Sequence, residues 1–327
     1  MSSTRDQVFP PKPTFTETEL PDQSGKVFLI TGGAAGLGFE LAKILYQKNG
    51  TVYIATRSLV KIERAIKTLR ESYPESKGRL EYIIVDLADL ATIRPAAQEF
   101  LNKETRLDVL FQNAGVMNTP KNAQTKQGHE LQMGTNAIAP HLLARCLEDI
   151  LVRTAHEEQG LGRRGTVRIV WLASMVTVGT PKGGVVIGTD GKPKLLGVSF
   201  DNYMQSKSGN IYLAHEWASR LGDKGVISVV VNPGVVKTEL QRHNTFILHE
   251  MMQGVISKPT RYGAYTQLFA GLSPEVTLER NGAFIIPWGR FGILPNHIEQ
   301  AMKPTSEKGA GISRQFWDYC ETVTKGF

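Results

Sequence analysis

The chain has 327 residues, of which 41% are apolar and 21% charged, and this ordinary globular composition excludes extensive disorder. Its two cysteines, Cys146 and Cys320, provide neither a disulfide framework nor a thiolate metal site, and no metal is expected. The formal net charge is +7, but the basic residues are scattered and lack interleaved aromatic residues, which argues against a nucleic-acid partner.

Uncharged stretches are too short to cross a membrane. The longest, at 27–39 and 226–236, contain Gly or Pro and fall short of the ~18 apolar residues that a membrane-spanning helix needs. The N-terminal sequence also lacks the apolar core of a secretory signal. These features predict a cytoplasmic protein with no membrane span.

The chain begins with a polar segment and continues as alternating strand and helix patterns. Residues 1–24 contain four prolines and are expected to form an extended tail laid on or off the surface, followed by one domain over 25–327. The expected strands are 26–33, 51–56, 79–86, 107–115, 167–174, 226–234 and 283–287, and the expected helices are 37–48, 59–72, 90–102, 131–151 and 203–221.

Several strand patterns are apolar without alternation, as is typical of strands covered by helices on both faces. The repeated strand–helix units predict an α/β fold, a doubly wound Rossmann domain with a parallel sheet of about seven strands. Ligands bind such sheets beyond the carboxyl ends of the strands. Two segments at that edge break the alternation: an insertion at about 178–200, and an apolar and aromatic segment at about 238–273 that we expect to cover the substrate.

A glycine-rich turn, TGGAAGLG at 31–38, follows the first strand and leads into a helix. Glycines allow a tight turn, and the free N–H groups at a helix start can bind a pyrophosphate. The turn therefore predicts a dinucleotide site, with a merely structural turn as the alternative.

The end of the second strand indicates which dinucleotide binds. NAD-binding proteins place a carboxylate near this position, whereas NADP-binding proteins place an arginine there. Here Thr56 is followed by Arg57, and Lys61 shares its helical face if the helix begins at Arg57. These residues predict NADP(H), and the alternative is that both are solvated charges at a helix start.

The next two strands also end in residues that suit a dinucleotide. The third strand leads into Asp86 and Leu87, and Asp86 could accept a hydrogen bond from adenine, cap the following helix, or do both. The fourth strand ends in Asn113-Ala114-Gly115. Small residues there would let the backbone pass close to a ribose, although a plain turn is also possible.

Tyr203 and Lys207 are four residues apart in a helical pattern, so their side chains share one face. A nearby ammonium group favours the phenolate and would lower the pKa of Tyr203 from its usual ~10. Such a tyrosine can exchange a proton with a carbonyl or alcohol oxygen. The YxxxK pattern is common by chance, but here Ser174 ends the preceding strand and the other motifs stand in order.

These ordered motifs resemble those of the short-chain dehydrogenase/reductase family over about residues 25–290. The chain is most similar to the retinol-dehydrogenase-like and WW-domain-oxidoreductase-like members and to soluble fungal reductases. This closer likeness lies in SKSGN at 206–210, AFIIPWGR at 283–290 and QFWDYC at 315–320.

The resemblance implies roles for individual residues. Asn136 would bend a helix and hold a water in a proton relay, and Ser174 would bind the substrate oxygen. Tyr203 would be the acid/base, and Lys207 would bind the nicotinamide ribose and lower the pKa of Tyr203. The remaining cofactor contacts that it implies are Gly32, Gly36, Leu37, Gly38, Asn113, Ala114, Gly115, Pro233, Val236 and Thr238.

The expected activity is an NADP(H)-dependent interconversion of a carbonyl and an alcohol, in the direction of reduction, on an apolar or aromatic small molecule. The resemblance also implies a place in secondary metabolism and a homodimer or homotetramer. The alternative is a catalytically idle NADPH-binding sensor or interaction protein on the same fold. Retention of all four residues with implied catalytic roles favours the enzyme.

Overall fold

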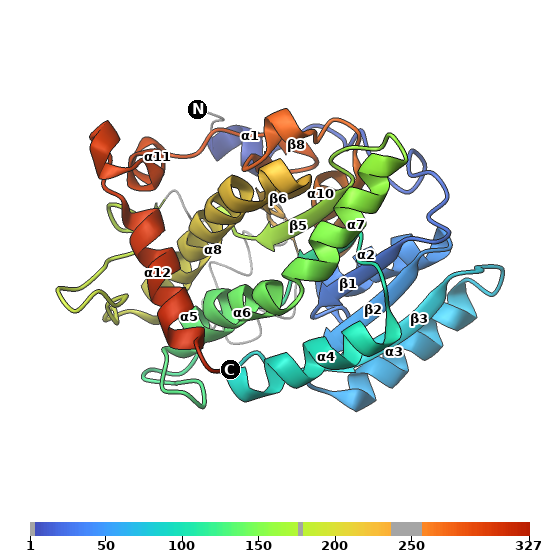
Figure 1. Cartoon of the computed structure of the whole chain (residues 1–327), viewed down its shortest axis with the longest axis horizontal. Coiled ribbons are helices and arrows are strands. Elements are labelled where there is room, and N and C mark those ends of the chain that lie inside the picture. The colour runs from blue at the N-terminus through green and yellow to red at the C-terminus, as the bar shows by residue number, and fades with distance from the viewer. Residues whose placement is uncertain (1–3, 176–178, 237–256) are drawn as a thin grey trace.

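The computed structural model describes residues 4–175, 179–236 and 257–327. An eight-stranded sheet with helices on both faces forms its centre (Figure 1). In spatial order the strands are β3 (Arg79–Ile84), β2 (Thr51–Thr56), β1 (Val27–Thr31), β4 (Val109–Gln112), β5 (Val167–Leu172), β6 (Val226–Val231), β7 (Phe284–Ile286) and β8 (Arg290–Phe291).

The predicted parallel α/β sheet is confirmed for the strands from β3 to β7, which all pair in parallel. The short β8 is an additional strand that pairs antiparallel with β7. It forms because the turn at 287–289, closed by a hydrogen bond from Gly289 N–H to Ile286 O, brings Arg290 back beside Ile286.

Two helical layers cover the sheet. The α-helices of the described residues are α1 (Thr4–Val8), α2 (Gly36–Gln47), α3 (Leu59–Ser72), α4 (Ile93–Lys103), α5 (Leu131–Met133), α6 (Ala139–Cys146), α7 (Glu148–Gly160), α8 (Ser199–Leu221), α10 (Thr260–Leu272), α11 (Asn296–Met302) and α12 (Ile312–Thr324). Val27 and Leu29 pack into the layer formed mainly by α4, α6, α7, α8 and α12, whereas Phe28 and Ile30 pack into the layer of α2, α3 and α10, as the alternation of side chains along a strand requires.

The long helix expected at 131–151 is divided. It begins with α5, passes through a π-helical turn at Gly134–Ile138, continues as α6 and breaks at Leu147 before α7. The apolar periodicity could not predict this break, because Leu147 is fully buried and fits the helical pattern. None of the helices in the described parts of the chain is long and apolar enough to span a membrane.

Within its described part, the segment expected to form an extended tail lies on the domain and is helical only at its start. Residues 4–8 form α1, and Phe15 and Leu20 are buried in the layer of α2, α3 and α10. The ring of Phe15 meets that of Phe269 edge-on, with centroids 6.3 Å apart. Phe15 and Leu20 are thus two apolar anchors that fasten a proline-rich segment to the domain.

The two segments that break the alternation differ in their packing. The insertion is tied to α8, because the Gln205 side chain accepts a hydrogen bond from Val186 N–H and donates one to Lys194 O. In the segment expected to cover the substrate, residues 260–272 form α10, whose Leu268 and Phe269 are core residues. The prediction of a cover is therefore wrong for this part, and residues 238–256 lie outside the described residues.

Candidate active site

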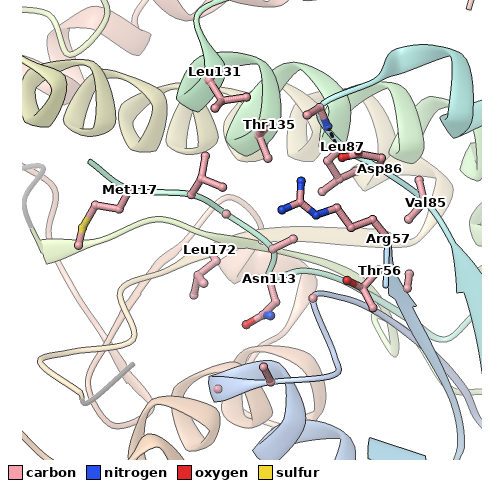
Figure 2. A pocket seen from close by; sticks show the side chains of 18 of the residues that line it. Thr56, Arg57, Val85, Asp86, Leu87, Asn113, Met117, Leu131, Thr135 and Leu172 are labelled. Carbon is pink, nitrogen blue, oxygen red and sulfur yellow. Dashed lines mark hydrogen bonds between the residues drawn. The ribbon is translucent and has the colours of Figure 1, made fainter. Parts of the chain in front are cut away.

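A pocket of about 420 Å³ opens at the carboxyl ends of the parallel strands (Figure 2), within the size range of small-molecule sites. Its walls come from the turns after β1, β2, β3 and β4 and from the end of β5. Most of the predicted cofactor residues line it, namely Gly32, Gly36, Leu37, Arg57, Lys61, Asp86, Leu87, Asn113, Ala114 and Gly115.

The glycine turn presents the start of α2 to this pocket. Gly32 and Gly36 have φ values of +69° and +57°, a conformation that other residues rarely adopt. The N-cap residue, Ala35, has no side chain that could accept hydrogen bonds from the first turn. The donors at the helix start therefore suit an anionic group such as a pyrophosphate.

Gly38, predicted as a cofactor contact, does not line the pocket. A Cβ atom on Gly38 would lie 2.6 Å from Gly32 O and 2.6 Å from Asn113 Nδ2. The glycine thus allows α2 to pack closely against the turns that follow β1 and β4.

Arg57 extends into the pocket from the end of β2 (Figure 2). Helix α3 begins only at Leu59, with Ser58 as its N-cap, so the argument that Arg57 and Lys61 share a helical face is wrong. Both residues nevertheless line the same pocket. Since Thr56 ends the strand, two basic side chains and no carboxylate mark the tip of β2.

Asp86 lies in the pocket wall but does not cap a helix. Its Oδ1 accepts a hydrogen bond from Ala88 N–H, whereas the cap of the next helical turn is Asp89. Of the two roles predicted for Asp86, the contact with adenine stays a prediction.

Asn113 fastens the turn after β4 to its neighbours. Its side chain donates a hydrogen bond to Thr31 O (2.9 Å) and accepts one from Gln267 Nε2 (3.0 Å) on α10. Sequence reasoning missed Gln267, although a fully buried glutamine in an apolar helix is a detectable signal once the helix is assigned to the core.

The four residues with implied catalytic roles lie around the ends of β4 and β5. Tyr203 and Lys207 project from α8, and the Tyr203 hydroxyl is hydrogen-bonded to the side chain of Ser174. Lys207 Nζ donates to Leu172 O (2.8 Å) and lies 5.8 Å from the centroid of the Tyr203 ring. This end adjoins the pocket, because Leu172 lines it.

Asn136 lies within the π-helical turn and joins the turn after β4 to α8. Its Oδ1 accepts from Val116 N–H (2.8 Å), and its Nδ2 donates to Val116 O (3.0 Å) and to Ser206 Oγ (2.9 Å). Ser206 was missed by sequence reasoning, since nothing in its spacing distinguishes it from a packing residue.

Burial governs the protonation of the two residues on α8. It raises the pKa of Tyr203 to about 12, although the hydrogen bond with Ser174 acts in the opposite direction. It also lowers the pKa of Lys207 to about 7. The pKa of Tyr203 is therefore raised, where a lowered one was predicted, because loss of solvent disfavours the phenolate. The lowering effect of Lys207 stays a prediction.

The segment after β6 lies beside the pocket without lining it. Val236 packs with Leu37 and Trp288, and a Cβ atom on Gly263 of α10 would lie 3.2 Å from Pro233 O. Thr238 lies outside the described residues. In the described parts of the chain, no three His, Cys, Asp or Glu side chains are grouped as metal ligands.

Comparison with known proteins agrees with this architecture. A family model described as short chain dehydrogenase matches residues 26–245. A short-chain dehydrogenase/reductase of Phomopsis amygdali is 41% identical over 326 residues, covering 98% of this chain and 96% of the relative. Short-chain dehydrogenase/reductase bet4 of Neocamarosporium betae is 38% identical over 331 residues, covering 100% of this chain and 94% of the relative. The crystal structure of an uncharacterized protein from Mycobacterium Paratuberculosis superposes with a TM-score of 0.66 at 23% identity, covering 95% of this chain and 97% of that protein.

Proposed function

The chain belongs to the short-chain dehydrogenase family and is thus an oxidoreductase that acts on CH–OH and C=O groups with a nicotinamide cofactor; we propose that the cofactor is NADP(H) and that the reaction is the reduction of a carbonyl. The observation that carries the proposal is the tip of β2, where Arg57 and Lys61 line the pocket. A guanidinium group there can pair with a ribose 2′-phosphate, which NAD lacks.

The pocket suits the rest of a dinucleotide. The glycine turn and the start of α2 would hold the pyrophosphate, Asp86 would accept a hydrogen bond from adenine, and Ala114 and Gly115 would lie along a ribose. The nicotinamide end would then lie toward β5, where Lys207 could bind its ribose, with Pro233 and Val236 nearby. A contact with Thr238 stays a prediction from the resemblance.

When bound, the reduced nicotinamide supplies the hydride to the carbonyl carbon. Tyr203 would donate its proton to the carbonyl oxygen, and Ser174 would donate a hydrogen bond to the negative charge that develops on the same oxygen. Asn136 would hold the turn after β4 against α8 through its contacts with Val116 and Ser206. The substrate is proposed to be an apolar or aromatic small molecule, and a place in secondary metabolism stays a prediction from the resemblance.

The cofactor preference is tested by titrating NADPH and NADH into the wild type and Arg57→Ala. We expect NADPH to bind the wild type at least ~10-fold more tightly than NADH, and Arg57→Ala to weaken NADPH alone by about 10–100-fold, as loss of a charge-assisted hydrogen bond does. Arg64→Ala, at an exposed site of α3, is the control. NADH binding as tight as NADPH binding would contradict the proposal.

The reductase activity is tested by following NADPH oxidation with a panel of apolar and aromatic aldehydes and ketones. In Tyr203→Phe we expect kcat to fall by about 10²–10⁴-fold, the usual contribution of a general acid, while NADPH affinity is retained. Unchanged turnover in this variant would refute the mechanism. Tight NADPH binding by a wild type that reduces none of the carbonyls would favour the idle cofactor-binding protein.

A further inference from the structure

The N-terminal segment packs against the edge of the sheet that holds β6, β7 and β8. Helix α1 precedes residue 26, where the family match begins, and it lies beside β8 (Figure 1). Arg290 at the start of β8 donates a hydrogen bond from Nη2 to Asp6 O (2.7 Å). Part of the chain outside the matched region is therefore anchored where β6 ends.

Gln7 of α1 makes a buried contact with the turn that follows β6. Its side chain is 4% exposed and that of Asn232 is 1% exposed, and Asn232 Nδ2 donates a hydrogen bond to Gln7 Oε1 (2.8 Å). A buried amide N–H needs an acceptor, and here the acceptor comes from a residue 225 positions earlier in the chain.

Asn232 shapes this turn with the other end of its side chain. Its Oδ1 accepts a hydrogen bond from Gly234 N–H (3.0 Å), and Gly234 has a φ of +79°. A Cβ atom on Gly234 would lie 2.7 Å from Trp288 Cζ3, so the turn has little room to move toward β7. Because Gln7 holds the amide nitrogen, the oxygen stays directed at Gly234.

The turn borders the part of the site where the reaction would take place. The pocket extends from Arg57 after β2 to Leu172 in β5, and β6 is the next strand. A dinucleotide with its 2′-phosphate at Arg57 therefore directs its reacting end toward β5 and β6, beside Ser174 and Tyr203. Beyond the turn, Val236 packs against Leu37, which lines the same pocket.

We propose that Gln7 is a positioning residue: it holds Asn232 and the turn at 232–236 in the shape that receives the nicotinamide end of the cofactor. The inference rests on the proposed function, because it assumes that a nicotinamide cofactor occupies the pocket. It gives the segment outside the family match a specific part in cofactor binding.

The test compares Gln7→Met with Gln23→Met in the full chain. Methionine keeps the approximate volume of glutamine but offers no strong acceptor. Gln23 is a suitable control because it is also buried in the N-terminal segment, while its Nε2 bonds only to the nearby Pro21 O and Asp22 O. Each variant is titrated with NADPH and with adenosine 2′,5′-bisphosphate, which lacks the nicotinamide half.

We expect Gln7→Met to weaken NADPH binding about tenfold, leave the bisphosphate affinity unchanged and accelerate amide hydrogen exchange at 232–236, while Gln23→Met changes none of these. Equal losses for both ligands, or no loss for either, would overturn the inference even if exchange increased. A wild type that binds neither NADPH nor NADH would instead refute the proposed function, and the cofactor role of Gln7 with it.

Discussion

At the scale of single residues, the buried pair on α8 is suited to proton donation. Tyr203 retains its proton at neutral pH, since burial raises its pKa to about 12, and a protonated phenol is the form needed to reduce a carbonyl. Lys207 has a pKa of about 7 because of its burial, so its charge is partly lost near neutral pH. The charge on Lys207, more than the proton on Tyr203, should set the pH dependence.

We predict that kcat/KM for NADPH at saturating carbonyl, which reports the ionisation of the free enzyme, is highest below pH 7. If the positive charge of Lys207 assists, kcat/KM should fall about tenfold per pH unit above its pKa of about 7. The measurement is a rate profile over about pH 5.5–9. Lys207→Arg, whose guanidinium stays charged, should be less active but lose this decline. A level wild-type profile would contradict the assignment.

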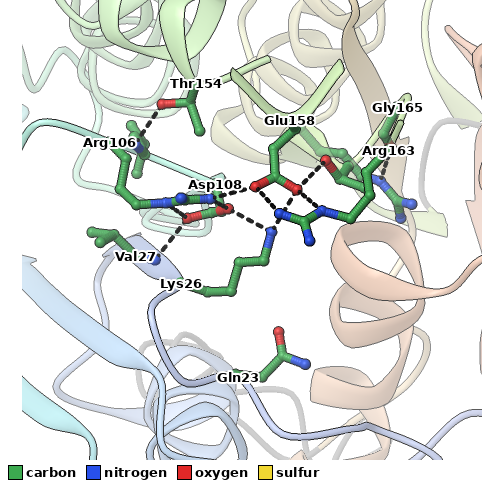
Figure 3. A network of polar contacts seen from close by, with 12 residues as sticks. Gln23, Lys26, Val27, Arg106, Asp108, Thr154, Glu158, Arg163 and Gly165 are labelled. Atoms are coloured by element: carbon green, nitrogen blue, oxygen red, sulfur yellow. Dashed lines mark hydrogen bonds and ion pairs between the residues drawn. The ribbon is translucent and has the colours of Figure 1, made fainter. Parts of the chain in front are cut away.

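At the scale of elements, an ion network around two buried carboxylates joins the amino ends of β1 and β4 to α7 (Figure 3). Glu158 on α7 pairs with Lys26 (3.0 Å), Arg106 (2.9 Å) and Arg163 (2.7 Å), and Asp108 pairs with Lys26 and Arg106. Burial raises the pKa of Glu158, but the three hydrogen bonds from Arg163, Arg106 and Lys26 outweigh it and hold the pKa at about 2.

Glu158→Gln should lower the free energy of unfolding by about 1.5–3 kcal/mol, because a buried carboxylate loses its charge-assisted hydrogen bonds to three partly exposed cations. The wild type should have this stabilisation in full above pH 4.5, the ordinary pKa of a glutamate, and lose it as the pH falls toward about 2. Urea unfolding at several pH values measures both effects. Asp318→Asn, which breaks an exposed pair with Arg314, should change stability by less than ~1 kcal/mol. Equal losses in the two variants would contradict the prediction.

At the scale of the whole molecule, α12 packs against the helix that carries Tyr203 and Lys207. Phe316 and Trp317 are buried, and the guanidinium of Arg220 on α8 lies 3.8 Å from the centroid of the Trp317 ring. Gly209 on α8 permits this close approach, since a Cβ atom there would lie 2.8 Å from Phe316 Cε1. Helix α12 thus packs closely against α8 and helps to hold it in place.

Gly209→Ala should therefore destabilise the protein by about 1–3 kcal/mol through overpacking. In a Phe316→Leu background, where the ring is absent, the same Gly209→Ala change should cost less. Gly160→Ala is the matched control, because no atom lies within 4 Å of the added Cβ on α7. Thermal unfolding measures all four variants. If Gly209→Ala were as stable as Gly160→Ala, α8 and α12 could move apart without loss of free energy, and the prediction would be wrong.

Much of the architecture follows from local sequence. Buried strands such as β1 and β6 consist almost entirely of apolar residues, and helices such as α3 and α4 carry their buried residues at helical spacing. Both kinds of element were therefore predictable without knowledge of their neighbours. The same holds for the position of the motifs, because parallel strands all end at one edge of the sheet. Arg57, Asp86 and Asn113 consequently line one pocket, as their places after three strands indicate.

The chain order of the seven parallel strands, the helices at 37–48, 59–72, 90–102 and 203–221, the family resemblance and the side chains that could meet at the carboxyl ends of the strands were all predictable from the sequence. How those side chains ionise and which groups hold them required the folded structure, because desolvation and hydrogen-bond partners depend on groups distant in the chain. The pKa of Tyr203, the contact between Gln7 and Asn232, and the buried position of Gln267 beside Asn113 all arise in this way, from segments that become neighbours only after folding.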